Sequence, residues 1–166
     1  FDKMHSKSDR IVRPLTIQTN LDEHRYHGAN PMILATTLLE ELPEIEDQVT
    51  LYRYGNQINY KVNDQNFTDR DFFFTTPELF RVFDFKLLRG DARTALAKPK
   101  SVVISRSKAI AVFGTEDVLG KVILTQGGNV EITGVMEDIP DNSHLFAELF
   151  FSELLPPNLM ESVKSS

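Results

Sequence analysis

Six of the chain's twelve phenylalanines lie in one segment, from Phe72 to Asp91. Burial of aromatic rings is among the strongest contributions to a protein core, so this segment must lie inside whatever the chain folds into. Its ionisable residues are of both signs and interspersed, which is more typical of a solvated rim than of a catalytic set. They are Glu78, Arg81, Asp84, Lys86, Arg89 and Asp91. The segment therefore favours a structural or interaction domain.

The length of 166 residues fits about one domain, which can bury roughly 68–70% of its unfolded surface. The absence of cysteine excludes disulfides and thiolate metal sites. A net charge of −6 disfavours nucleic acid or an anionic bilayer as the main partner. No apolar run approaches the roughly 18–20 residues that cross a bilayer, so we expect the chain as given to be soluble. The chain starts at Phe1 without a signal core, and we expect it to be a fragment or a processed chain.

The first part of the chain predicts one strand and one helix. Phe1 to Arg10 is polar and is interpreted as a lead-in. Ile11 to Leu21 alternates in the manner of a strand, and Asp22 to Gly28 is predicted to be a polar connection. Asn30 followed by proline is typical of a helix start, and apolar spacing predicts a helix over Pro31 to Leu42.

The middle of the chain predicts a hairpin and then the aromatic segment. Gln48 to Tyr54 is expected to pair with Ile58 to Val62 through a turn at Gly55. Phe72 to Thr75 is expected to be a short strand that leads into a helix over Pro77 to Phe83.

The last part predicts a second mixed block. Ser101 to Ile104 is expected to be a strand, and Ser105 to cap a helix that ends at Phe113. A Gly-Gly turn predicts a hairpin between Lys121 to Leu124 and Val130 to Met136. Leu145 to Ser152 is apolar enough to return to the core. Asp91 to Lys100 is expected to be a surface connection, and the sequence as a whole favours an α+β fold.

Two groups of residues have some features of a binding site. Gly114 to Val122 has five residues between its glycines and no hydroxyl after Lys121, so a helix cap and a turn are favoured over a phosphate loop. His24 and His27 stand beside Asp22 and Glu23, but a structural metal site needs further ligands, and a solvated loop is favoured. His5 lacks even such neighbours.

Ser143 and His144 are adjacent, and no Gly-x-Ser-x-Gly motif supports a nucleophile there. Asp141, Asn142 and Ser143 are better explained as residues that hold a turn. The acidic run from Glu44 to Asp47 is interpreted as a solvated face. We therefore assign no catalytic, cofactor-binding or metal-binding residue and expect no cofactor.

Five stretches of the chain occur together, in this order, in a known family. They are Phe1-Asp-Lys-Met-His5 through Arg13; Leu42-Pro-Glu-Ile-Glu46; Phe73 through Phe85-Lys-Leu-Leu-Arg-Gly90-Asp91; Ser101-Val-Val-Ile-Ser105 through Gly114 and Gly120-Lys121; and Ile132-Thr-Gly-Val-Met-Glu-Asp-Ile-Pro140 through His144. On these stretches the chain resembles the extracytoplasmic domain of MacB-like and FtsX-like ABC transporter permeases.

The chain departs from the family's pattern in two respects. Val118 stands where the family commonly has proline, which affects only the conformation of that turn. The family's domain usually continues for many residues beyond the region of Ser143 and His144. We therefore expect a chain that stops at Ser166 to lack part of one lobe.

The resemblance implies a periplasmic domain on the bacterial inner membrane, held between the first two membrane helices of a permease. It implies a porter-like lobe, about residues 1–71 plus 137–166, with a smaller mixed α/β lobe inserted at about 72–136. The implied partners are the permease's own membrane helices, a cytoplasmic ABC ATPase, a second copy of the permease, and a periplasmic adaptor or substrate.

The function that follows is non-catalytic: transmission of ATP-driven motion, for export of a substrate or control of a periplasmic partner. The first alternative is a stand-alone periplasmic module that binds a ligand or peptide. The second is a hydrolase with a site assembled from scattered residues, for which Ser143 and His144 are the test residues.

The aromatic segment gives a stability prediction. Phe80→Ala is expected to cost about 3–5 kcal/mol if the ring is buried. A loss below about 1 kcal/mol in denaturant melts would indicate an exposed partner surface instead.

Overall fold

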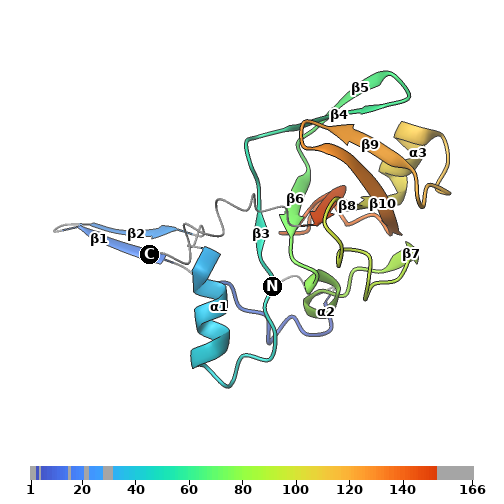
Figure 1. Cartoon of the computed structure of the whole chain (residues 1–166). Helices are drawn as coiled ribbons and strands as arrows, with labels where there is room; N and C mark the ends of the chain where they lie inside the picture. Colours follow the sequence, from blue (N-terminus) through green and yellow to red (C-terminus); the bar gives the residue numbers. More distant parts are fainter. Residues whose placement is uncertain (1–2, 4, 15, 21–22, 28–31, 153–166) are drawn as a thin grey trace.

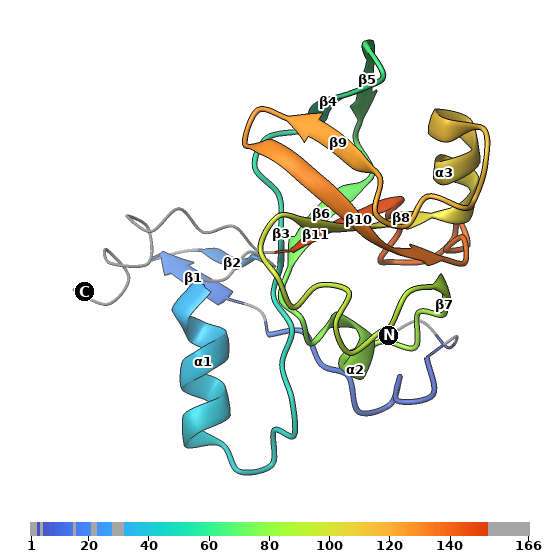
Figure 2. The same cartoon turned by 45° about the vertical axis from the view of Figure 1, so that its right-hand side comes forward.

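The computed structural model describes residues 3, 5–14, 16–20, 23–27 and 32–152. A large mixed sheet forms the body of the protein, and a helix and a separate hairpin lie to one side of it (Figures 1 and 2). The elements in chain order are β1 Thr16–Asn20, β2 Glu23–His27, α1 Met32–Glu41, β3 Leu51–Tyr52, β4 Ile58–Val62, β5 Gln65–Asp69, β6 Phe72–Thr75, α2 Leu79–Val82, β7 Leu87–Arg89, β8 Ser101–Ser105, α3 Arg106–Phe113, β9 Val122–Thr125, β10 Gly128–Met136 and β11 Leu149–Ser152. This arrangement confirms the predicted α+β class.

The large sheet has the order β3-β6-β11-β8-β10-β9-β4-β5, with β7 paired to β10. The last described strand, β11, lies between β6 and β8, parallel to β6 and antiparallel to β8. Successive side chains of a strand point to opposite faces. Phe72, Phe74 and Phe151 accordingly pack in the core on one face, and Phe73 and Phe150 in the core on the other.

Each face of the sheet is covered by a different element. Ala109 of α3 packs in the first core, while Leu79 of α2 and Phe83 pack in the second. The side chain of Ser105 accepts a hydrogen bond from the Lys108 amide and so caps α3, as predicted. Each helix is thus positioned by its own buried residue, Ala109 in α3 and Leu79 in α2.

The central strands and the second block agree with the sequence. Phe72–Thr75, the strand at Ser101 and the return of the chain through β11 are confirmed, as is the hairpin between β9 and β10. Helix α1 is also confirmed, although Asn30 and Pro31, the residues that predicted its start, lie outside the described residues.

The predicted pairing of Gln48 to Tyr54 with Ile58 to Val62 is wrong. β3 pairs with β6, whereas β4 pairs with β5 and β9. The actual hairpin turns at Asn63 and Asp64, whose φ angles are 47° and 66°. Two consecutive left-handed residues match the twist of paired strands, so this turn joins β4 to β5.

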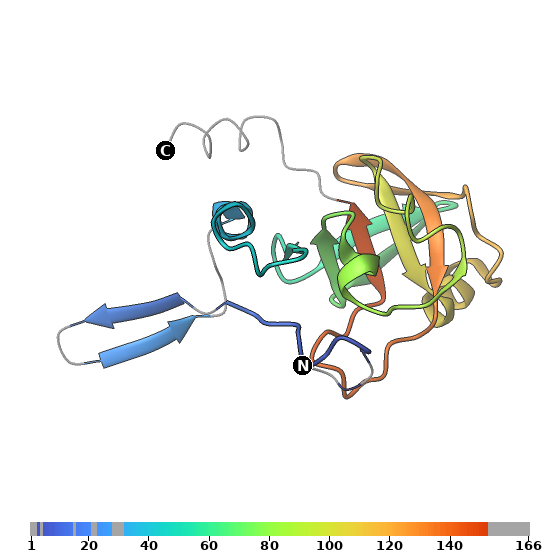
Figure 3. The ribbon, with the colours of Figure 1, turned by 90° about the horizontal axis from the view of Figure 1, so that it is seen from below.

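Asp22 to Gly28 is not simply a polar connection, because Glu23–His27 forms β2 in an antiparallel pair with β1. The strand predicted from Ile11 begins only at Thr16. Asp22 and Gly28 themselves lie outside the described residues. Figure 3 shows this hairpin extending away from the large sheet.

Two further expectations need correction. The segment from Asp91 to Lys100 is not wholly at the surface, because Ala95 and Leu96 are buried. Helix α2 spans only four residues and has no side-chain cap. Its face toward the core is formed by Leu79, and the Phe80 ring is only partly buried.

No helix among the described residues is long and apolar enough to cross a membrane. Strands β3 to β5, which precede residue 72, belong to the same sheet as the strands that follow it. The two-lobed division and its boundaries remain predictions.

The unequal burial of the rings changes the expected cost of removing them. Phe150→Ala should cost about 3–5 kcal/mol, because this ring is fully buried between elements. Phe80→Ala should cost clearly less, because water already contacts part of its ring in the folded state. Urea unfolding of both variants measures the difference, and equal losses would contradict the unequal burial of the two rings.

Candidate functional site

The first described residues dock against the core. The His5 side chain is 1% exposed, and its ring lies 5.0 Å from the ring of Phe83 and 5.2 Å from that of Phe85. Its Nδ1 accepts a hydrogen bond from the Asp84 amide at 3.1 Å. The expected polar lead-in is thus wrong at this position, because an imidazole that accepts a hydrogen bond can be buried among aromatic rings.

Two neighbours of His5 extend the contact. The Ser6 amide donates to the Asp84 carboxylate, and Lys7 Nζ donates to the Arg81 carbonyl at 2.9 Å. The hydrogen bonds from Ser6 hold the pKa of Asp84 below its ordinary value. We call His5, Ser6 and Lys7 the N-terminal clamp, because three consecutive residues bind to the last turn of α2 and the residues that follow it.

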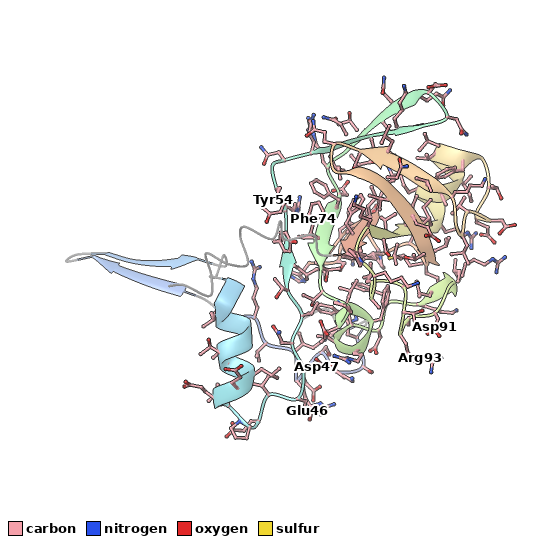
Figure 4. The ribbon with its side chains drawn as sticks, in the orientation of Figure 1. Glu46, Asp47, Tyr54, Phe74, Asp91 and Arg93 are labelled. Carbon is pink, nitrogen blue, oxygen red and sulfur yellow. The ribbon has the colours of Figure 1, made fainter. Side chains whose placement is uncertain are left out.

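The acidic run before β3 joins the same region. Arg10 pairs with Glu46 at 2.9 Å, and Arg81 pairs with Asp47 at 2.8 Å. Glu46 and Asp47 lie on the chain that leads from α1 to β3 (Figure 4). Exposed ion pairs contribute little stability, but these two connect the N-terminal segment and α2 to one extended segment.

A buried charge cluster lies at the other side of the sheet. Lys108 of α3 contacts Asp69 at 2.5 Å and Glu148 at 2.8 Å, and the Tyr60 hydroxyl donates to Asp69 at 2.6 Å. Tyr60 is 4% exposed and Asp69 is 8% exposed. Lys108 and Glu148 are only partly buried, and the buried carboxylate of Asp69 is both paired and hydrogen-bonded, which offsets the cost of its burial.

The cluster shifts two pKa values upward. Burial, followed by the hydrogen bond and charge of Asp69, raises the pKa of Tyr60. Burial alone would lower the pKa of Lys108, but the hydrogen bonds and charges of Asp69 and Glu148 outweigh it and raise that pKa. Lys108 therefore stays charged and Tyr60 neutral at ordinary pH, which suits a structural lock between α3, the β4–β5 hairpin and the start of β11.

A groove of about 520 Å³ opens over β6 and β11. Phe72, Phe74 and Phe151 line it, together with Tyr54 from the chain between β3 and β4. Figure 4 shows Tyr54 and Phe74 side by side, and their ring centroids are 5.7 Å apart. Lys100, just before β8, is the only charged one of the described residues that line this groove.

The glycine-flanked stretch considered as a phosphate loop is a helix end and a turn. Gly114 ends α3 in the left-handed conformation with a φ of 75°. Val118 is fully buried, and the Gly120 amide donates to the Ile132 carbonyl at 2.8 Å. Glu116 lies between Arg89 and Arg106. The Gly114 and Gly120 amides, which would have to face a phosphate, are thus used within the protein.

Ser143 forms part of a turn, as predicted. Its amide donates to the Pro140 carbonyl at 2.9 Å, and its Oγ accepts from the Leu145 amide at 3.1 Å. His24 and His27 lie on β2, and their side chains are outside the described ones. Among the described residues, no group of three or more His, Asp or Glu side chains is placed to hold a metal ion.

The family profile of the MacB-like periplasmic core domain matches residues 1–159. The chain belongs to this family. It is therefore an extracytoplasmic domain of an ABC transporter permease, which confirms the family and the location that the sequence predicted. A comparison with curated proteins gives no match.

Solved structures with a similar fold include three from bacterial membrane proteins. A domain assigned to a permease protein from Porphyromonas gingivalis is 27% identical with a TM-score of 0.61, over 72% of this chain and 55% of that one. The extracellular domain of the ABC-type transporter YknZ from Gram-positive bacteria is 17% identical with a TM-score of 0.50, over 80% of this chain and 66% of that one. The periplasmic region of MacB from Actinobacillus actinomycetemcomitans is 18% identical with a TM-score of 0.49, over 78% of this chain and 68% of that one. This MacB-like domain thus spans only about half of the first of these chains.

Sequence reasoning missed His5, Lys108 and Lys100 as residues of interest in this MacB-like domain. Lys108 follows the predicted cap Ser105 by three residues, so its position on the first turn of a helix was readable. Its partners Asp69 and Glu148 are distant in sequence, and no local pattern joins them. The same holds for His5, whose aromatic pocket lies almost eighty residues further along the chain.

The charge cluster leads to a prediction for the free energy of unfolding at alkaline pH. The pKa of Tyr60 is raised above 10.0 in the folded state, so the unfolded chain loses this proton first as pH rises. The stability that Tyr60 contributes is complete below pH 10.0 and falls above it. Tyr60→Phe should cost about 1–3 kcal/mol at neutral pH through the lost buried hydrogen bond.

The same variant should also make stability decline less steeply above pH 10.0, since one linked proton is removed. Denaturant unfolding at several pH values between neutral and about pH 11 measures both the stability lost at neutral pH and the slope of stability against pH. The slope should change by roughly one linked proton. The control is Tyr54→Phe, because Tyr54 is 49% exposed and keeps its ring in the variant. An unchanged alkaline slope in Tyr60→Phe would contradict the role of the cluster.

Proposed function

We propose that this domain is non-catalytic and transmits ATP-driven motion of the permease to the periplasmic side. The observation that carries the proposal is the N-terminal clamp. By resemblance to the family, the chain before His5 comes from the first membrane helix. His5 contacts Phe83 and Phe85, and the Phe85 ring lies 5.6 Å from that of Phe150 in the central strand β11.

A displacement of the membrane helix is then passed to the sheet through packed rings and hydrogen bonds. Packed cores deform little, so motion at one side moves the whole body instead of being absorbed locally. The ion pairs of Arg10 and Arg81 with the segment before β3 support the same coupling.

The partners in this proposal are the permease's own membrane helices and an ABC ATPase on the cytoplasmic side. A second copy of the permease completes the transporter, and the two-lobed division is part of the same proposal. In this proposal the transmitted motion serves the export of a substrate or the control of a periplasmic adaptor.

The test uses the full-length permease, reconstituted in lipid vesicles with its ATPase. The domain has no cysteine, so single and paired cysteines can be introduced for labels. Nitroxides at Asp9→Cys and Lys98→Cys report whether the N-terminal segment moves with the body. Because the clamp holds them together, their distance should not change between nucleotide-free and ATP-bound states.

A dye at Lys98→Cys and acceptor lipids in the vesicle report motion of the body relative to the membrane. This energy transfer should change on ATP binding. The double variant His5→Ala with Asp84→Ala should lose most of that change while ATP hydrolysis continues, and the exposed Asp141→Ala is the matched control. A nucleotide-dependent distance between the labels at Asp9 and Lys98, or an unaffected signal in the double variant, would refute transmission through the clamp.

A further inference from the structure

The groove over β6 and β11 has the dimensions of a small-molecule site. Its volume of about 520 Å³ lies within the range of roughly 300–1,000 Å³ that is common for ligand pockets. It is bounded by the chain between β3 and β4 on one side and by the turn between β9 and β10 on the other. This location is separate from the N-terminal clamp, which packs on the opposite face of the sheet.

The floor of the groove is aromatic. The ring centroid of Phe74 lies 5.4 Å from that of Phe151, 5.7 Å from that of Tyr54 and 6.1 Å from that of Phe72. Phe74 stacks on Tyr52 but is only partly buried, and Tyr54 is 49% exposed, so part of each side chain is open to a ligand. Apolar surface of this kind favours a ligand with an apolar body.

Three polar side chains that line the groove are hydrogen-bonded within the protein. The Ser152 hydroxyl accepts from the Ser101 amide at 3.0 Å, and the Asn59 amide oxygen accepts from the Thr68 hydroxyl at 2.7 Å. Thr125 Oγ1 donates to the Gly128 carbonyl at 3.0 Å. An extended peptide binds by adding a strand to an open sheet edge, but β6 and β11 beneath this groove each have a strand on both sides.

Lys100 supplies the charge. None of the ion pairs formed by the described residues includes Lys100, although the whole chain carries a net charge of −6. Its φ angle is 57°, a left-handed conformation that is costly for a residue other than glycine. The backbone is held there because the Lys100 carbonyl accepts from the Glu131 amide at 2.9 Å. Among the described residues that line the groove, this strained residue is the only charged one.

We propose that this groove binds a single-chain amphiphile with one negative charge, of the long-chain carboxylate type. The apolar chain lies on the rings of Phe74, Tyr54 and Phe151, and the carboxylate pairs with the Lys100 ammonium. This inference goes beyond transmission of motion, because it gives the domain a ligand site that works whether or not the clamp couples to the membrane.

The test is isothermal titration of the 166-residue chain with decanoate, 1-decanol and decyltrimethylammonium, each kept below its solubility limit and, for the two ionic probes, below the micelle concentration. The three probes share the apolar chain and differ in charge. Decanoate should bind roughly two- to fivefold more tightly than 1-decanol, the gain expected for one ion pair with an exposed lysine. Decyltrimethylammonium should bind more weakly than 1-decanol.

Variants separate the charge from the apolar contact. Lys100→Met should bring decanoate to the affinity of 1-decanol, while Lys100→Arg should retain the preference. Lys98→Met is the matched control, since Lys98 is exposed, two residues away, and outside the groove. Tyr54→Ala should weaken both probes by a similar factor, because it removes ring surface and leaves the charge.

Circular dichroism checks that each variant keeps the fold. Binding of decanoate that Lys100→Met leaves unchanged, or no binding of any of the three probes, would overturn the proposal. Titration with an octapeptide of uncharged side chains tests the competing class of ligand, and tighter binding of the peptide than of decanoate would also overturn it.

Discussion

The architecture depends on the burial of three adjacent central strands on both faces. In β6, β11 and β8 the apolar side chains alternate, so that successive ones enter the two different cores. Exposing both faces of such strands to water is unfavourable, so the rest of the chain covers most of each face. Helix α3 covers one face, and α2 with its flanking turns covers the other. The aromatic rings of Phe72 and Phe150 are fully buried, one in each layer.

This constraint explains why the N-terminal residues are part of the core and not a loose tether. The second face is covered by small elements, because α2 has only four residues. The His5 ring fills space beside Phe83 and Phe85 that such a short helix leaves. The N-terminal segment at His5 is therefore held by a packed contact. In this MacB-like domain, that contact connects the proposed source of motion with the sheet.

On the face covered by α3, an ion pair stabilises the edge of the sheet, and a groove stays open beside the chain between β3 and β4. The β4–β5 hairpin lies at the sheet's edge, where Asp69 pairs with Lys108 of α3 and ties it to the body. Between β3 and β4 the chain crosses from one edge of the sheet towards the other. Tyr54 and Phe74 stay partly uncovered beside this crossing and form the groove next to Lys100. The groove is thus a consequence of topology.

The sequence by itself determined the local elements and the family. Phe72–Thr75, the capped helix after Ser105 and the Gly-Gly hairpin follow from propensity, capping and turn chemistry, which act over a few residues. Tertiary structure decided what pairs with what: β4 with β5 and β9, His5 with its aromatic pocket, and Lys108 with Asp69. Most of these contacts join residues far apart in the chain, and their free energy comes from burial and charge pairing that no local pattern records.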